Sequence, residues 1–133
     1  MTHASDDAAK FNQTLAQLSG SLAACDIVVS RLHADWSSFG SWELHVQRGS
    51  EADRYHEAAR LDPGHAIPPD VIRCFWDGRD HYLMIETSPS RPLSAPNEWR
   101  KEHAKGFDTS DKAVHYLQDY LKRRFQHDSP EKA

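Results

Sequence analysis

The 133-residue sequence lacks the short motifs by which enzymes and cofactor-binding proteins are commonly recognised. It contains neither a G-x-x-x-x-G-K-[ST] nor a G-x-G-x-x-G loop for phosphate binding, and no G-x-S-x-G nucleophile elbow. His56-Glu57 begins like a zincin motif, but Arg60 occupies the position of the second histidine ligand. We therefore expect a protein that is not an enzyme and that holds no cofactor and no metal.

Cysteines and long apolar runs are also scarce. Cys25 and Cys74 form no C-x-x-C pair and stand in apolar settings, which predicts two buried free thiols. The first ten residues lack the basic and apolar regions of a signal peptide, and no apolar run is long enough to span a bilayer. We expect a cytoplasmic protein with no membrane partner.

Basic residues are too few for a protein that depends on phosphate neutralisation. The chain has 20 acidic and 16 basic residues and a net charge of −4, so we expect no nucleic-acid partner. From Arg100 onward there are 8 basic and 6 acidic residues, which leaves −6 on the first 99. The length predicts one domain, 1–133, with frayed ends at 1–5 and 127–133, and its acidic body suits a basic partner.

The clearest structural signal is residues 71–87, where two β-branched and aromatic runs flank Asp77-Gly78-Arg79-Asp80. This pattern predicts an antiparallel hairpin, with either a two-residue turn or a four-residue loop. Both alternatives give the same two faces. One face is apolar and carries Ile72, Cys74, Trp76, Leu83 and Ile85. The other is mixed and carries Val71, Arg73, Phe75, Tyr82, Met84 and Glu86.

Amphipathic helices are predicted at both ends of the chain. The first has Ser5 as its N-cap, ends at Gly20 or near Ala24, and carries a stripe of Phe11, Leu15, Leu18 and Leu22. The last is capped by Asp108 or Thr109 and carries a stripe of Val114, Leu117, Leu121 and Phe125.

The remaining elements lie between these helices. Strands are predicted at 26–33 and 41–48, and the second buries Trp42, Leu44 and Val46. A short helix is predicted at 50–60, capped by Ser50, with Tyr55, Ala58 and Ala59 facing inward. Residues 97–103 suit a short helix or an edge strand equally well.

These elements predict an α+β fold, an antiparallel sheet of four or five strands covered on one face by the N-terminal and C-terminal helices. Because two helices cover only one face, the other is left for solvent or a partner. Trp42 and Trp76 should lie in the core, whereas Trp36 and Trp99 stand in polar contexts that suit aromatic anchors. The predicted partner-binding residues are Trp36, Glu43, His45, Arg73, Phe75, Tyr82, Met84 and Trp99.

In element order, from the G-S-W-E-L-H-V strand to the D-T-S-D-K-A-V-H-Y-L-Q-D-Y-L helix, residues 8–125 resemble the small acidic α+β immunity proteins of bacterial toxin systems. The resemblance implies a non-enzymatic inhibitor that occludes a toxin's active site. Alanine at Tyr82 or Trp99 should then weaken binding and leave the thermal midpoint nearly unchanged. Alternatives are a dimeric type III secretion chaperone and a ligand-binding or enzymatic cupped sheet. The oligomeric state stays open.

Overall fold

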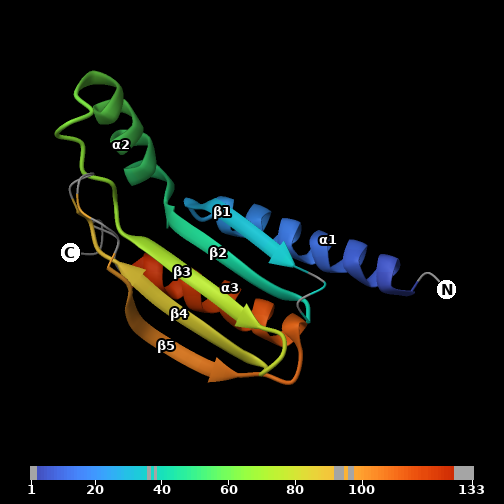
Figure 1. Ribbon diagram of the computed structural model, residues 1–133. Coiled ribbons are helices and arrows are strands. Elements are labelled where there is room, and N and C mark those ends of the chain that lie inside the picture. Colours follow the sequence, from blue (N-terminus) through green and yellow to red (C-terminus); the bar gives the residue numbers. More distant parts are fainter. Residues whose placement is uncertain (1–2, 36, 38, 92–94, 96–97, 128–133) are drawn as a thin grey trace.

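The structure, a computed structural model, describes residues 3–35, 37, 39–91, 95 and 98–127. Within these residues the chain forms helices and strands in an α+β arrangement (Figure 1). In chain order they are α1 (His3–Ala23), β1 (Ile27–Asp35), β2 (Ser41–Arg48), α2 (Gly49–Leu61), β3 (Val71–Asp77), β4 (Tyr82–Ser88), β5 (Arg100–Gly106) and α3 (Ser110–His127).

The five strands form one antiparallel sheet in the order β1-β2-β3-β4-β5, so each strand pairs with its neighbour in the sequence. This confirms the predicted fold class. The hairpin of β3 and β4 has the four-residue loop, because Asp77 pairs with Tyr82. Of the two alternatives for residues 97–103, the edge strand is the correct one, since β5 begins at Arg100.

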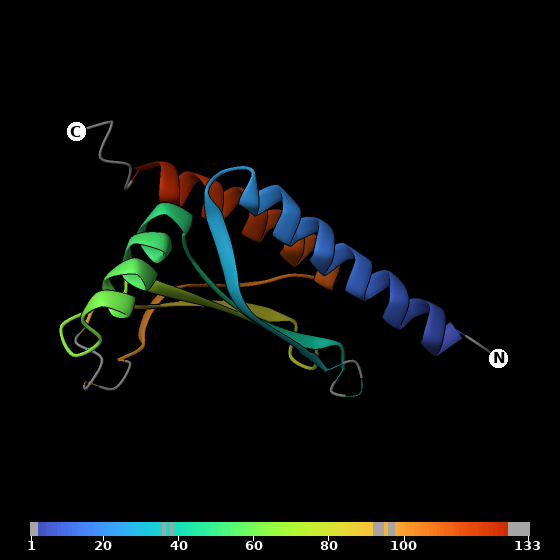
Figure 2. The ribbon, with the colours of Figure 1, turned by 90° about the horizontal axis from the view of Figure 1, so that it is seen from above.

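Helices α1 and α3 lie side by side against one face of the sheet (Figure 2). Leu15, Leu18 and Leu22 of α1 and the apolar stripe of α3 meet the inward-facing residues of the strands, as the 3.6-residue and two-residue periods of the two element types require. The side chain of Phe11 lies outside the described part of the structure. Trp42 and Trp76 lie in this core at 1% and 2% exposure, and the Trp42 indole N–H donates to Ser110 Oγ at 2.9 Å. The residues buried in this cluster are Leu15, Leu18, Leu22, Ile27, Trp42, Leu44, Val46, Ile72, Cys74, Trp76, Leu83, Ile85, Ala113, Val114, Leu117, Leu121 and Phe125.

The N-cap predicted for α3 is confirmed, and the N-cap predicted for α1 is wrong. Thr109 caps α3, because its Oγ1 accepts a hydrogen bond from the backbone N–H of Lys112 at 3.2 Å. Helix α1 begins at His3, so Ser5 lies inside the helix and is not its N-cap. Residues 3–5 and His127, predicted to fray, belong to α1 and α3, and the rest of the two predicted frayed ends, 1–2 and 128–133, lies outside the described part of the chain.

Helix α2 projects beyond the end of the sheet at which β2 finishes and β3 starts (Figure 1). The predicted cap, Ser50, is wrong: its backbone N–H and its hydroxyl both donate to the carboxylate of Asp26, at 3.1 and 3.0 Å. The Asp26 carbonyl also accepts the N–H of Gly49 at 2.8 Å. A carboxylate at the positive end of the helix dipole thus anchors α2 to the start of β1.

Two further predictions about burial are wrong. Of the residues predicted to face inward from α2, Ala58 is exposed and Tyr55 and Ala59 are only half-buried, because the fully buried positions of this helix are Gly49 and Ala52 in its first turn. Cys25 is exposed, because it lies in the turn between α1 and β1 and not in either element. Cys74 is buried as predicted.

Candidate functional site

The face of the sheet opposite α1 and α3, called the open face below, is built from residues that alternate with the core residues of the same strands. Within the described part of the chain, no helix lies over it (Figures 1 and 2). Strand register places its side chains in rows across the sheet, with Glu43 opposite Phe75 and His45 opposite Arg73. Its members are Arg31, His33, Glu43, His45, Arg73, Phe75, Tyr82, Met84 and Glu86.

One ion pair and one histidine–carboxylate contact lie at the middle of the open face. Arg73 donates from Nε and Nη2 to Oε1 of Glu86 at 3.0 and 2.5 Å. On the neighbouring strand, His45 Nε2 lies 2.9 Å from Glu43 Oε2. All four side chains are between 15% and 28% exposed, so the surrounding residues shield these charges only in part. Such pairs restrict side-chain rotamers more than they stabilise the fold.

Trp99 packs on top of these pairs. The Arg73 Cζ lies 4.4 Å from the Trp99 ring centroid, within the range of a cation–π contact, and the His45 ring meets the Trp99 ring edge-on at 5.3 Å. Trp99 precedes β5, and the adjacent Glu98 holds this segment in place by donating its N–H to Ser88 Oγ at 3.2 Å. Trp99 is therefore half-buried and ordered by its neighbours on the sheet.

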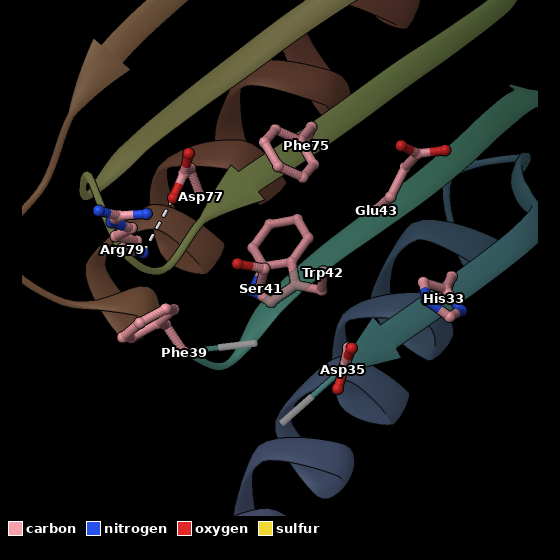
Figure 3. A pocket seen from close by; sticks show the side chains of 9 residues that line it. All are labelled: His33, Asp35, Phe39, Ser41, Trp42, Glu43, Phe75, Asp77 and Arg79. Carbon is pink, nitrogen blue, oxygen red and sulfur yellow. Dashed lines mark hydrogen bonds between the residues drawn. The ribbon is translucent and has the colours of Figure 1, made fainter. Parts of the chain in front are cut away.

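Nearer the other end of the face, Phe75 and Tyr82 meet edge to face with ring centroids 6.4 Å apart. Beyond them the β1–β2 and β3–β4 connections enclose a cavity of about 360 Å³, called the acidic pocket below (Figure 3). Its lining comprises three carboxylates, two phenylalanines, one guanidinium, one imidazole, one hydroxyl and one indole. These residues are Asp35, Glu43, Asp77, Phe39, Phe75, Arg79, His33, Ser41 and Trp42.

The two connections that form the pocket are fixed to each other by a close backbone approach. The N–H of Gly78 donates to Ser41 Oγ at 3.0 Å, and a Cβ at Gly78 would lie only 1.9 Å from the carbonyl oxygen of Phe39. Only glycine fits at this position. Phe39 has a φ of 60°, and its side chain is 68% exposed. The wall of the pocket therefore carries an aromatic ring that faces solvent.

The structure brings together most of the residues that the sequence predicted as partner-binding. Glu43, His45, Arg73 and Trp99 form one contiguous cluster. Met84 lies opposite Phe75 on the neighbouring strand, and Phe75 contacts Tyr82. Trp36 lies outside the described residues.

Sequence reasoning missed the acidic pocket, most of whose lining it had assigned to a loop, a turn and a strand end. A signal was present, because consecutive antiparallel strands place the first and third connections at the same end of a sheet. With that rule, Phe39 and Asp77 are expected to be neighbours. The close approach of Gly78 to Phe39, which brings the two connections together, is not encoded in the sequence pattern.

A second polar cluster lies on the helix-covered side, between β5 and α3. Glu102 accepts hydrogen bonds from Thr87 and Tyr120 and from Arg124, whose Nε lies 3.0 Å from Glu102 Oε1. Burial by itself would raise the pKa of Glu102, but these hydrogen bonds outweigh it and hold the pKa below its ordinary value. For Tyr120, burial and the bond to Glu102 raise the pKa above its ordinary value.

We compared the chain with models of known protein families, with curated proteins and with solved structures. None of them matches it. Within the part of the chain that the structure describes, no helix is both long and apolar enough to cross a bilayer.

Proposed function

We propose that this chain is a non-enzymatic protein-binding domain, an immunity protein that neutralises a cognate bacterial toxin by covering its active site with the open face. One observation carries the proposal. The strands that close a dry core against α1 and α3 present, on their other side, aromatic and charged side chains that no described helix covers. Tryptophan, tyrosine and arginine are the residues most enriched at the energetic centres of protein interfaces.

The fixed orientation of side chains on the open face also supports binding. Arg73 is fixed by Glu86 on one side and by the Trp99 ring on the other, so its rotamer is set before any partner arrives. A partner that meets this surface loses little side-chain entropy from it, which favours affinity. The acidic excess of the first 99 residues suits a partner with a basic surface.

The buried thiol supports binding over catalysis. Burial raises the pKa of Cys74 far above its ordinary value, and the negative charge of Glu102 makes a smaller contribution in the same direction. The thiol is therefore protonated at neutral pH and is a poor nucleophile. Cys74 serves as a small apolar side chain in the core.

A second candidate function is binding of a small ligand, which the acidic pocket favours. Its volume of about 360 Å³ is at the lower end of the range of roughly 300–1,000 Å³ found for ligand sites. The two functions differ in what they require of the rest of the open face. A toxin inhibitor uses the Trp99 region and the pocket together, whereas a small ligand uses the pocket alone.

Co-expression tests the immunity function. Each protein encoded beside this chain in its own genome is expressed alone and then together with the chain, and growth and co-purification are measured. The proposal expects one neighbour that arrests growth alone, becomes harmless with the chain and co-purifies with it in a fixed ratio. If no such neighbour exists, and none of the proteins captured from the native host arrests growth, the proposal is wrong.

A variant pair then locates the interface. Tyr82→Ala on the open face should weaken toxin binding by about tenfold or more, as for an aromatic residue at an interface centre. Asp53→Ala, at an exposed position on α2, is the matched control and should change affinity by less than about twofold. Equal effects of the two variants would place the interface elsewhere.

A further inference from the structure

Carboxylates from three strands line the acidic pocket. Asp35 stands at the end of β1, Glu43 within β2 and Asp77 at the end of β3, and all three line one cavity (Figure 3). The backbone N–H groups of Arg79 and Asp80 both donate to Asp77 Oδ1, at 2.9 and 3.0 Å, which fixes that carboxylate at the rim. Glu43 is fixed in turn by His45.

Positive charge in the pocket is smaller. Arg79 belongs to the lining, but its guanidinium lies beyond Asp77, on the side away from Phe75 and Glu43 (Figure 3). His33 adds a positive charge only when it is protonated. With three carboxylates and one guanidinium, the lining carries a formal charge of −2 at neutral pH with His33 neutral. A cation is therefore the ligand that this pocket attracts.

Aromatic rings determine what kind of cation fits best. The ring of Phe75 borders the cavity from the strand side, and the exposed ring of Phe39 borders it from the β1–β2 connection. A guanidinium group is planar and weakly hydrated, stacks on aromatic faces and donates hydrogen bonds in its own plane to carboxylates. Lysine's ammonium group is compact and strongly hydrated, so it gains less from such a site.

We propose that the acidic pocket binds a guanidinium group, namely an arginine side chain on the surface of the partner protein. The identity of that partner rests on the proposed function, but the chemistry of the pocket does not. The arginine inserts between the phenylalanine rings and pairs with Glu43 and Asp77, while Trp99 and its neighbours contact the surrounding surface. This arrangement makes the pocket the place where the open face selects its partner.

The first test uses the isolated chain and a small probe. N-acetyl-arginine amide is titrated into the ¹⁵N-labelled protein at constant ionic strength, with N-acetyl-citrulline amide as the uncharged isostere and N-acetyl-lysine amide as the ammonium counterpart. We expect saturable shifts around Phe39, Glu43 and Asp77 with the arginine probe, weaker binding of the lysine probe and none of the citrulline probe. No saturable shift with the arginine probe, or equal binding of the arginine and citrulline probes, would overturn the proposal. Equal binding of the lysine probe would overturn the guanidinium assignment.

Charge-neutralising variants make the test specific to the pocket. Glu43→Gln and Asp77→Asn keep the oxygen atoms that accept the hydrogen bonds from His45 and from the turn, and each should weaken probe binding by about three- to fivefold, as expected for a partly shielded pair. Asp80→Asn is the matched control, because Asp80 is exposed in the same turn and does not line the pocket. It should change probe binding by less than about twofold, and an equal effect in all three variants would overturn the proposal.

Failure of this proposal is distinguishable from failure of the proposed function. If the arginine probe binds and no toxin partner exists, the pocket assignment stands and the immunity function falls. If a toxin partner binds, and neither the probe nor the Glu43→Gln and Asp77→Asn variants show an effect, the immunity function stands and the pocket assignment falls.

Discussion

The helix-covered face and the open face are made from alternate residues of the same strands. Ile85 is fully buried beneath the helices, whereas its neighbour Met84 is half-buried on the open face. The covered face is mainly apolar over β2, β3 and β4, and a polar cluster lies at its edge, where Thr87 of β4 and Arg124 of α3 bond Glu102 of β5. The open face instead carries the Arg73–Glu86 ion pair, whose guanidinium contacts the Trp99 ring. The comparison shows that the covered face supplies the core of the fold, whereas the open face has side chains fixed by their neighbours but no helix over them in the described part of the chain.

Neighbouring residues on one strand give the sharpest test of this comparison and the largest expected effect. Ile85→Ala should lower the free energy of unfolding by about 3 kcal/mol, because it leaves a cavity in a core that cannot fully collapse. Met84→Ala should cost about 1 kcal/mol or less. Urea denaturation followed by circular dichroism measures both, and similar losses would mean that the open face is also a core.

Two aromatic residues, Trp99 on the open face and Phe39 in the wall of the acidic pocket, should differ in stability by an intermediate amount. Trp99→Ala removes the contacts with Arg73 and His45 and should cost about 1–2 kcal/mol of stability. This replaces the expectation, drawn from the sequence, that its thermal midpoint would stay nearly unchanged. Phe39→Ala, at a ring that is 68% exposed, should cost less than about 0.5 kcal/mol. A midpoint for Trp99→Ala equal to that of Phe39→Ala would show that the Trp99 contacts do not order the face.

The polar edge of the covered face should give the smallest effect, and one that depends on pH. The folded-state pKa of Glu102 lies below its ordinary value, so the charged carboxylate stabilises the fold at neutral pH. That contribution is lost as the pH falls below about 4.5 and through the folded-state pKa. Glu102→Gln should cost about 1 kcal/mol at pH 7, after allowance for its partial exposure, and should lose less stability than the wild type at pH 3.

Glu57→Gln is the control for this effect, because Glu57 pairs with Arg60 on the exposed surface of α2. Its stability should follow that of the wild type from pH 7 to pH 3. If Glu102→Gln shows the same acid dependence as Glu57→Gln, hydrogen bonding does not stabilise the charged form of Glu102.

Local patterns explain which parts of this fold could be predicted. Alternation from Val71 to Thr87 and in Ser41–Arg48 directly encodes which side chains face the core, so the hairpin, strand β2 and the two faces follow from the sequence. The spacing of Val114, Leu117, Leu121 and Phe125 does the same for α3. These features depend on residues that are close in the chain.

The features that could not be predicted depend on contacts between distant residues. Asp26 caps a helix that begins 23 positions later, which no capping pattern around Ser50 reveals. Trp99 stands in a polar segment whose sequence suits an exposed anchor, yet the hydrogen bond between Glu98 and Ser88 places it against the sheet. The acidic pocket needs both the strand register and the close approach of Gly78 to Phe39.

The position of α3 after all five strands in the chain has a consequence for biosynthesis. Every strand pairs with the one before it, so the sheet can assemble in step with translation as each strand leaves the ribosome. The apolar side of β3 and β4, however, acquires its cover only when Leu117 and Leu121 emerge, after all five strands. Until then a nascent chain with a formed sheet exposes the apolar side of β3 and β4 to chaperones and to other chains. Helix α3 is thus the element that completes the cover of the sheet.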